Sequence, residues 1–315
     1  MHTVLRSASK EVVIGEDQPF CIIGERINPT GRKLFQEQLR SDDLSRIERD
    51  VADQVAGGAM VLDVNMGVPL ADEAELMRKA VRLIQSLTDL PLVIDSSIIE
   101  VLEAGLATYE GKALVNSVTA EDERMDAILP LVKRHGAAII CLPNDEEEIP
   151  EQPERRLELV RKILDVANGK YQIPLEDIVI DPLAMPIGAD TVLVRRTLDT
   201  ISLIRSEFGL NMTLGASNVS FGMPNRSAIG AAFLPMAMVA GLTSAIVDAR
   251  SPEIVRAAKA ADLLLDRDPW GASWISRHRA EQVGVAQAAA AQAAAEAEPG
   301  AGTAVGGPAA SLGAS

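Results

Sequence analysis

Polar side chains suited to binding or catalysis follow short apolar runs at intervals along the chain. They are Glu25, Asn28, Asp63, Asn65, Asp95, Asn116, Asp181, Ser217, Asn218 and Asp248. Because β-strand interiors disfavour Asp and Asn, their recurrence at the ends of apolar runs indicates a common site. For any one of them, a helix N-cap or a hydrogen bond within a loop is the alternative interpretation.

These residue types favour recognition of a neutral heterocycle that carries several hydrogen-bond donors. An ionised Asp only accepts hydrogen bonds, whereas the Asn amide both donates and accepts them. A pterin ring presents an amino group, ring N–H donors and a carbonyl acceptor, so one or two Asp and one Asn satisfy that edge. No Lys, Cys or His stands among these residues, which separates the pattern from nucleophilic or imidazole chemistry.

The apolar runs that precede these residues are expected to be strands. They number eight and span 20–27, 60–65, 92–95, 113–118, 137–142, 178–182, 212–217 and 245–248. They are short, continuous and rich in branched aliphatic residues, as strands of a parallel sheet covered on both faces are.

Amphipathic segments separate the runs. Leu44, Ile47, Val51 and Val55 repeat at helical spacing, and the same period recurs over 76–87. Further helices are expected at 122–134, 154–167, 191–207, 228–242 and 252–265. Glycines that favour left-handed helix ends precede the following runs, at Gly57–Gly58, Gly136 and Gly209.

Strict alternation of strand and helix predicts a parallel sheet, and eight units favour a closed (β/α)8 barrel of the TIM type. The segment after the first run, Glu25–Gly31, lacks the GxGxxG pattern of a dinucleotide fold. In such a barrel the polar residues at the carboxyl ends of strands converge on one mouth.

Composition limits the partners. The chain has 315 residues, 47% hydrophobic and 3% aromatic, so we expect one aliphatic core. A net charge of −15 argues against nucleic acid as a partner, although a local Arg can still bind an anion. Cys21 and Cys141 are far apart and the three histidines are scattered, so neither a disulfide nor a metal site is expected.

The ends of the chain differ from its middle. The first ten residues lack the apolar region of a signal peptide, and the most apolar stretch, 228–242, is too short to span a membrane. We therefore expect a cytoplasmic protein that does not bind membranes. The barrel is expected over 1–281, and the Ala- and Gly-rich residues 282–315 are expected to be a largely disordered tail.

Several motifs together resemble the pterin-binding barrels. Gly24-Glu25-Arg26-Ile27-Asn28-Pro29-Thr30-Gly31 is similar to the opening of methyltetrahydrofolate:corrinoid protein methyltransferases and of the folate domain of cobalamin-dependent methionine synthase. The resemblance continues in order through Ile94-Asp95-Ser96, Leu114-Val115-Asn116-Ser117, Ile180-Asp181-Pro182 and Gly215-Ala216-Ser217-Asn218-Val219-Ser220. It covers about residues 20 to 265 and places the fold in the dihydropteroate synthase-like superfamily.

The resemblance implies a role for each matching residue. Asp95, Asn116 and Asp181 would hold the pterin ring, and Asn218 would approach the methyl-bearing N5 as the catalytic residue. Arg226 would meet the pterin or the acidic tail of folate, and Asp63 would line the same mouth. Glu25 and Ser217, which stand within the matching motifs, would complete the folate-binding set.

The chain departs from dihydropteroate synthase itself. That family carries a Ser-Arg-Lys segment where this chain has Ser217-Asn218-Val219, and an Arg-x-His segment where this chain has 245–249. Its Ser-Thr-Arg-Pro loop is replaced by Met66-Gly67-Val68-Pro69. The basic groups for a pyrophosphate leaving group and p-aminobenzoate are therefore missing, which disfavours a synthase.

The expected activity is methyl transfer between N5 of methyltetrahydrofolate and the cobalt of a corrinoid. The chain has no Asp-x-His-x-x-Gly cobalt-ligating segment, so cobalamin is expected on a separate corrinoid protein. The resemblance also implies a homodimer. A different pterin-dependent synthase and a non-catalytic folate-binding protein remain as alternatives, and the direction of transfer stays open.

Overall fold

The apolar runs form a curved parallel sheet. The computed structural model describes residues 1–280 and 282–283, and its main sheet follows the order β8-β7-β6-β5-β4-β3-β9. The strands are β3 (Cys21–Ile27), β4 (Val61–Asn65), β5 (Leu92–Asp95), β6 (Leu114–Thr119), β7 (Ala138–Leu142), β8 (Ile178–Ile180) and β9 (Ser244–Val247). Each of these strands begins within two residues of the start of an expected strand, so seven of the eight expected strands are confirmed.

The remaining run, 212–217, joins the two ends of this sheet without forming a regular strand. Met212 bridges Ile180 of β8, and Gly215 bridges Ile246 of β9. Backbone hydrogen bonds of 2.9–3.0 Å tie the segment to both neighbours. The chain then turns into a 3-10 helix over Ala216–Ser220, which ends the extended stretch early. The barrel is thus closed by a short irregular segment.

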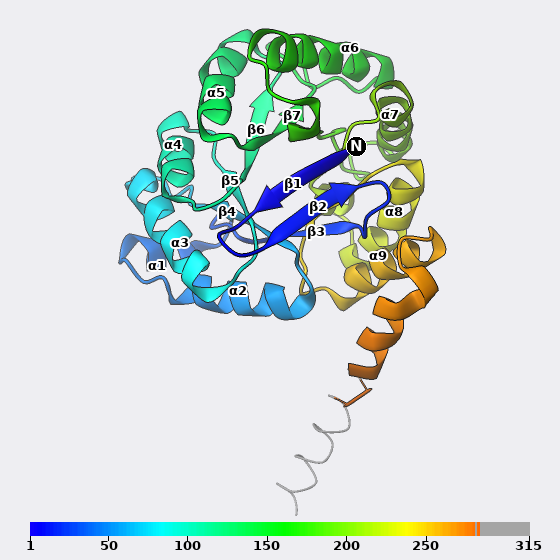
Figure 1. The fold of residues 1–315 in the computed structure, drawn as a ribbon, viewed down its shortest axis with the longest axis horizontal. Helices are drawn as coiled ribbons and strands as arrows, with labels where there is room; N and C mark the ends of the chain where they lie inside the picture. The colour runs from blue at the N-terminus through cyan, green and yellow to red at the C-terminus, as the bar shows by residue number, and fades with distance from the viewer. Residues whose placement is uncertain (281, 284–315) are drawn as a thin grey trace, which may run out of the picture. The chain divides into compact units, whose positions relative to one another are not determined.

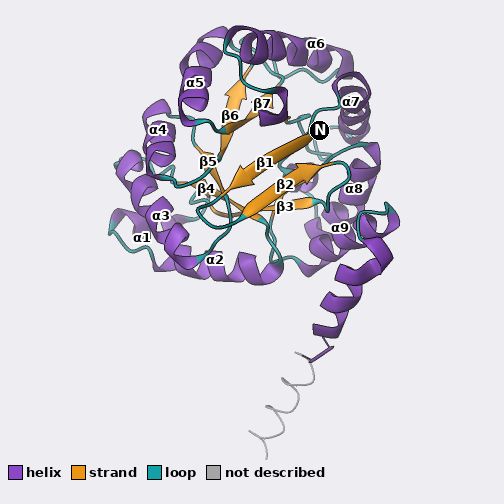
Figure 2. Cartoon of the chain, viewed as in Figure 1, coloured by secondary structure: helices purple, strands orange, loops and turns teal. Residues whose placement is uncertain are grey.

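Helices surround the sheet (Figure 2). They are α1 (Lys33–Arg40), α2 (Ser45–Gly57), α3 (Glu73–Leu87), α4 (Ile99–Thr108), α5 (Asp122–His135), α6 (Pro153–Leu164), α7 (Val192–Phe208), α8 (Arg226–Ala240) and α9 (Pro252–Leu264). The three glycine helix ends are confirmed, with φ of 103° at Gly58, 59° at Gly136 and 61° at Gly209.

Two helices were not expected from the sequence pattern. In α4 the buried positions include Val101, Leu102 and Gly105, so the apolar face is too wide to give a clear helical period. Gly105 is needed there because a Cβ would lie 2.6 Å from Cγ2 of Ile94. In α1 only Phe35 and Leu39 are buried, which is too little for a period to be detected.

An N-terminal hairpin, which the sequence pattern also missed, lies across the barrel (Figure 1). Its strands are β1 (His2–Arg6) and β2 (Glu11–Gly15), paired antiparallel. Thr3 donates a hydrogen bond to the carbonyl of Glu176, just before β8. The amide of Asn211 donates to Thr3 Oγ1 at 3.0 Å and to the carbonyl of Ile14 at 2.9 Å. The hairpin therefore closes the end of the barrel where the strands begin.

The barrel has an inner and an outer core. Alternate strand residues such as Ile22 and Leu62 pack against the helices. Their neighbours pack inside the barrel against Leu5, Val12 and Ile14 of the hairpin. This alternation follows from the two-residue period of a strand. Cys21 and Cys141 are both buried free thiols, as expected.

The chain divides into two compact units, Met1–Pro269 and Trp270–Ser315. In the second unit the described backbone is helical at 272–280 and 282–283. Residues 284–315, which make up most of the expected tail, lie outside the described residues, so the expected boundary at 281 stays a prediction. Within the described residues, no helix has the length and apolar character to cross a membrane.

The hairpin is expected to stabilise the barrel through its inward-facing side chains. Ile14→Ala should lower the free energy of unfolding by about 2–5 kcal/mol, because Ile14 is fully buried in the inner core. Val13→Ala is the matched control, since its side chain lies on the opposite face of β2 and is partly exposed. Urea unfolding of both variants measures the difference, and equal losses would contradict a plug role for the hairpin.

Candidate functional site

The polar residues reach one site because of the strand period. Asp63, Asp95 and Asn116 each stand two residues after a side chain of the inner core, and so do Glu25 and Asp181. Residues two apart on a strand face the same side, so these five side chains continue the inner face of the barrel. They emerge where the strands end, above the apolar layer.

A cavity of about 350 Å³, here called the polar cavity, lies at this end of the barrel. It is lined by residues of β3 and the loop after it, by residues at the ends of β4, β5, β6, β8 and β9, and by the segment that closes the barrel. They are Glu25, Arg26, Asn28, Thr30, Arg32, Asp63, Asp95, Asn116, Asp181, Gly215, Asn218 and Ile246. Six of the eight site residues expected from the sequence therefore share one cavity.

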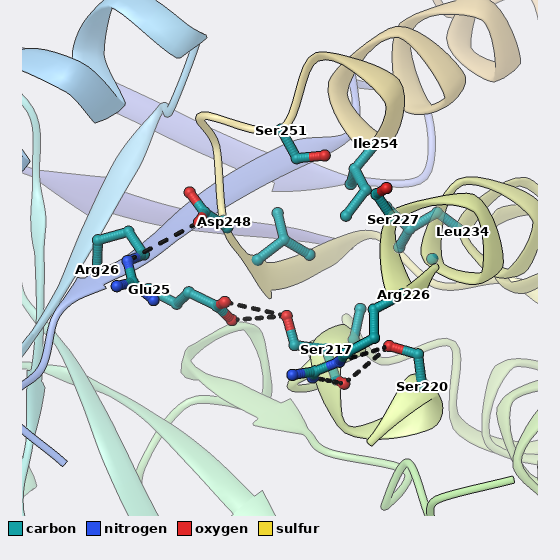
Figure 3. Close-up of a pocket in the computed structure, with 13 residues that line it drawn as sticks. Glu25, Arg26, Ser217, Ser220, Arg226, Ser227, Leu234, Asp248, Ser251 and Ile254 are labelled. Atoms are coloured by element: carbon teal, nitrogen blue, oxygen red, sulfur yellow. Dashed lines mark hydrogen bonds and ion pairs between the residues drawn. The ribbon is translucent and has the colours of Figure 1, made fainter. Parts of the chain in front are cut away.

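The other two, Ser217 and Arg226, line an adjoining cavity of about 240 Å³ that shares Glu25 and Arg26 with the first. Ser217 Oγ donates to both carboxylate oxygens of Glu25 at 3.0 Å (Figure 3). The Arg226 guanidinium donates to Ser220 Oγ at 3.2 Å and to the carbonyl of Ser217 at 2.7 Å. In this structure Arg226 thus holds the loop after Gly215 rather than facing the polar cavity.

Amide side chains orient two of the buried carboxyls. Asn65 Nδ2 donates to Asp95 Oδ2 at 2.9 Å, and Asn116 Nδ2 donates to Asp63 Oδ1 at 3.3 Å. Asn65 is itself fixed, because its Oδ1 accepts from the backbone N–H of Gly67 at 2.8 Å. The site therefore includes Asn65 as a supporting residue.

The loop that follows Asp181 is held by a buried arginine that sequence reasoning missed. The N–H of Leu183 donates to Asp181 Oδ1 at 2.8 Å, and Leu183 has a φ of 61°, unusual for a branched side chain. Arg156, fully buried on α6, donates to the carbonyl of Pro182 at 2.8 Å and to that of Leu183 at 3.1 Å. Thr197 Oγ1 donates to the same Leu183 carbonyl at 3.1 Å. No sequence signal separates Arg156 from the surface arginines around it.

The carboxyls of the cavity are held out of water. Burial raises the pKa of Asp95 to about 6 and that of Asp181 to about 7. Burial and the neighbouring Asp95 raise the pKa of Asp63 well above its ordinary value, and burial also raises the pKa of Glu25. The ionised form of such carboxyls is stabilised most by a ligand that brings hydrogen-bond donors.

Asn218 stands at the rim of the polar cavity with its amide available. The residue is exposed, and within the described part of the chain its side chain has no hydrogen-bond partner. A helix-capping role is excluded for α8, whose N-cap is Asn225. Gly215 leaves room for the amide, because a Cβ there would lie 3.0 Å from Asn218 Nδ2.

Barrels of this class carry their chemistry at the carboxyl ends of the strands, which is where this polar cavity lies. Residues 24–248 match the family described as pterin binding enzyme. The chain belongs to this family.

Among the described residues, no group of three or more His, Cys, Asp and Glu side chains could hold a metal ion.

Two relatives are about equally similar in sequence. A methylcorrinoid:tetrahydrofolate methyltransferase of Eubacterium limosum is 30% identical over 273 residues, which cover 85% of this chain and 99% of the relative. A methionine synthase of Mycobacterium leprae is 31% identical over 286 residues, covering 85% of this chain but 23% of the relative. The chain thus spans about a quarter of that larger enzyme.

Solved structures confirm the barrel. The dihydropteroate synthase of Xanthomonas albilineans in complex with 7,8-dihydropteroate has a TM-score of 0.60 at 19% identity, covering 80% of this chain and 95% of that one. The 7,8-dihydropteroate synthase of Vibrio fischeri has a TM-score of 0.63 at 16% identity, covering 85% and 100%. At these identities the likeness concerns the fold alone.

The buried carboxyl of Asp181 is expected to destabilise the ligand-free protein at high pH. Its folded pKa of about 7 exceeds the unfolded value of about 3.9, so the folded state binds more protons between these limits. Stability from this group is therefore present at low pH and is lost as pH rises towards about 7. Asp181→Asn should be more stable than wild type at pH 8 and lose that advantage near pH 4.

Urea unfolding at pH 4, 6 and 8 measures this difference. The amide retains an oxygen to accept the N–H of Leu183, so the loop contact need not be lost. A stability difference that stays constant with pH would contradict the expected burial of an ionisable Asp181.

Proposed function

We propose that this protein transfers a methyl group between N5 of methyltetrahydrofolate and the cobalt of a corrinoid carried by a separate protein. The observation that carries the proposal is the polar cavity, in which buried carboxyls and an amide face one space and Asn218 offers an unpaired amide at the rim. That combination supports a held pterin ring with its N5 side turned outward.

The pterin edge supplies the donors that the cavity lacks. In the proposed complex, ionised Asp95 and Asp181 accept hydrogen bonds from the amino group and ring N–H groups, and Asn116 completes the edge. Burial disfavours the ionised form of both carboxyls, so hydrogen-bond donors of a ligand would stabilise each carboxylate. Asp63 and Glu25 would border the same ring, with Glu25 held by Ser217.

The bond that breaks joins the methyl carbon to N5. The cobalt nucleophile takes the methyl group, the electron pair of the C–N bond stays on N5, and N5 then takes a proton. We propose that the Asn218 amide donates a hydrogen bond to N5 that strengthens as this electron density develops, which lowers the barrier. The proton comes from solvent, to which the rim is open. The reverse transfer passes through the same contacts.

The Eubacterium relative supports a corrinoid protein as the partner, because this chain covers 99% of a protein named methylcorrinoid:tetrahydrofolate methyltransferase. The methionine synthases match over only 23% of their length, so their overall reaction is not carried over. Direction of transfer is left open, since one set of residues serves both directions.

A synthase and a non-catalytic folate-binding protein are the competing functions. The site supports the synthase less well, because Asn218 occupies a segment where dihydropteroate synthases carry basic residues. A folate-binding protein would use the same cavity but would not demethylate methyltetrahydrofolate. A methyl-transfer assay with free reduced cobalamin separates the proposed methyltransferase from both alternatives, because neither of them would transfer the methyl group.

We also propose a homodimer and a cytoplasmic location. The outward face of α8 supports the first, because from Ser227 to Ala240 the helix has no charged residue, while Met236 and Val239 are 53% and 65% exposed. An uncharged exposed face of this kind is typical of subunit contacts. The cytoplasmic location remains a prediction from the sequence.

Removal of one ring-binding carboxyl is expected to weaken folate binding. Asp95→Ala and Asp181→Ala should each cost about 1–3 kcal/mol of binding free energy, because a donor of the pterin loses its partner in a buried site. Calorimetric titration with methyltetrahydrofolate measures the loss. Asp126→Ala, an exposed position on α5, is the matched control. Unchanged affinity in both cavity variants would rule out this pocket.

Asn218→Ala is expected to slow methyl transfer much more than it weakens binding. Ground-state N5 gains little from the amide, whereas the transition state gains more, so the loss should appear as about 100- to 1000-fold in the single-turnover rate. Equilibrium binding is measured on the same variant. Equal loss of affinity and rate would make Asn218 a ring-binding residue, and an unchanged rate would remove it from the mechanism.

A further inference from the structure

A third cavity adjoins the polar cavity at Arg32. It has a volume of about 190 Å³ and lies beside α1. Its lining residues are Arg32, Lys33, Leu34, Phe35, Gln38 and Arg46. Arg32 lines both cavities, which places them next to each other. We call it the basic cavity.

The lining contains three cations and no carboxylate, in a protein whose net charge is −15. The carboxylate of Asp50 lies beneath, 2.8 Å from Arg32 Nη2 and 3.2 Å from Arg46 Nε, and is only 1% exposed. This one buried carboxylate is thus shared by Arg32, Arg46 and, at 4.0 Å, Arg250. Exposed Lys33 has no ion-pair partner in the described residues, so positive charge is left uncompensated at this cavity.

Arg32 is held in place before any ligand arrives. Its guanidinium lies 4.8 Å from the centre of the Phe35 ring, and it also donates to the carbonyl of Arg26. Phe35 is itself buried, which fixes the ring. A cation that is already ordered loses little conformational entropy when it binds an anion.

We propose that the basic cavity binds the carboxylates of the γ-glutamyl tail of folate. The proposal rests on the proposed function, which places the pterin in the polar cavity and leaves the tail to extend from it. The cavity shared through Glu25 is the other exit, but there the cations Arg26 and Arg226 are matched in number by the carboxylates of Glu25 and Asp248, so its lining has no excess positive charge. The basic cavity beside Arg32 is lined by cations and by no carboxylate.

Each added γ-glutamyl residue brings one more carboxylate. Wild-type protein should therefore bind methyltetrahydrofolate triglutamate more tightly than the monoglutamate, and raised salt should reduce the difference. The reference is 5-methyltetrahydropteroate, which lacks the glutamate and whose single carboxylate is fixed on the aminobenzoate ring ahead of the tail. The ratio of triglutamate to monoglutamate affinity then reports on the tail alone.

The test compares this ratio in wild type, Lys33→Gln, Lys33→Glu and Arg40→Gln by calorimetric titration. Lys33 is exposed, so its substitution should not affect folding. We expect Lys33→Gln to lower triglutamate affinity roughly two- to fivefold, as for one exposed ion pair, and Lys33→Glu to lower it further. Arg40→Gln lies on the same helix outside the cavity and should match wild type.

The outcomes separate the two proposals. Two results together support the tail site. Pteroate binding is unchanged in all variants, and the preference for the triglutamate falls in the Lys33 variants. Equal affinity for both folates in wild type, or a Lys33→Glu ratio equal to that of wild type, overturns the tail site while pteroate binding still supports the polar cavity. If wild type binds none of the three ligands, the proposed function fails and the tail site fails with it.

Discussion

The two-residue period of the strands is the constraint on which the rest of the structure depends. On β3, β4, β5, β6 and β8 the inward face first supplies an apolar side chain to the inner core and then, one period later, a polar side chain to the cavity. Core and site are therefore parts of one continuous surface. A register shift of a single residue in β4 would turn Val64 towards the cavity in place of Asp63, and the cavity would lose a carboxyl group.

The polar cavity shows how a site can be costly to its own fold. Buried carboxyls raise their pKa because ionisation in a poorly hydrated space is unfavourable, and Asp63 and Asp95 repel each other as well. The protein offsets part of this cost with oriented donors from Asn65, Asn116 and the backbone of Leu183. In the proposed complex the hydrogen-bond donors of a pterin would stabilise these carboxylates further, so the cost of burying them would favour a ligand rich in donors.

Sequence patterns predicted the features that repeat and missed those that depend on tertiary contact. The strands, the caps at Gly136 and Gly209 and the meeting of Asp95 with Asn116 all follow from local periodicity. The hairpin was missed because its inward residues, such as Ile14, find partners only inside the closed barrel. Arg156 and the basic cavity were missed because a single cation carries no signal until its neighbours in space are known. The displacement of Ser217 and Arg226 from the polar cavity depends on the 3-10 turn over Ala216–Ser220, which no residue pattern announces.

The hairpin that closes the barrel also has a consequence for synthesis. Thr3 bonds to Asn211, 208 positions later, and to Glu176, 173 positions later. β1 and β2 are therefore synthesised well before the segments that complete their contacts, and contacts of such long range slow folding. Until strand β8 and the segment after it have been made, Leu5 and Ile14 lack part of the inner core, including Val179. During this interval part of the apolar surface of the hairpin stays exposed to water, and such surface favours aggregation.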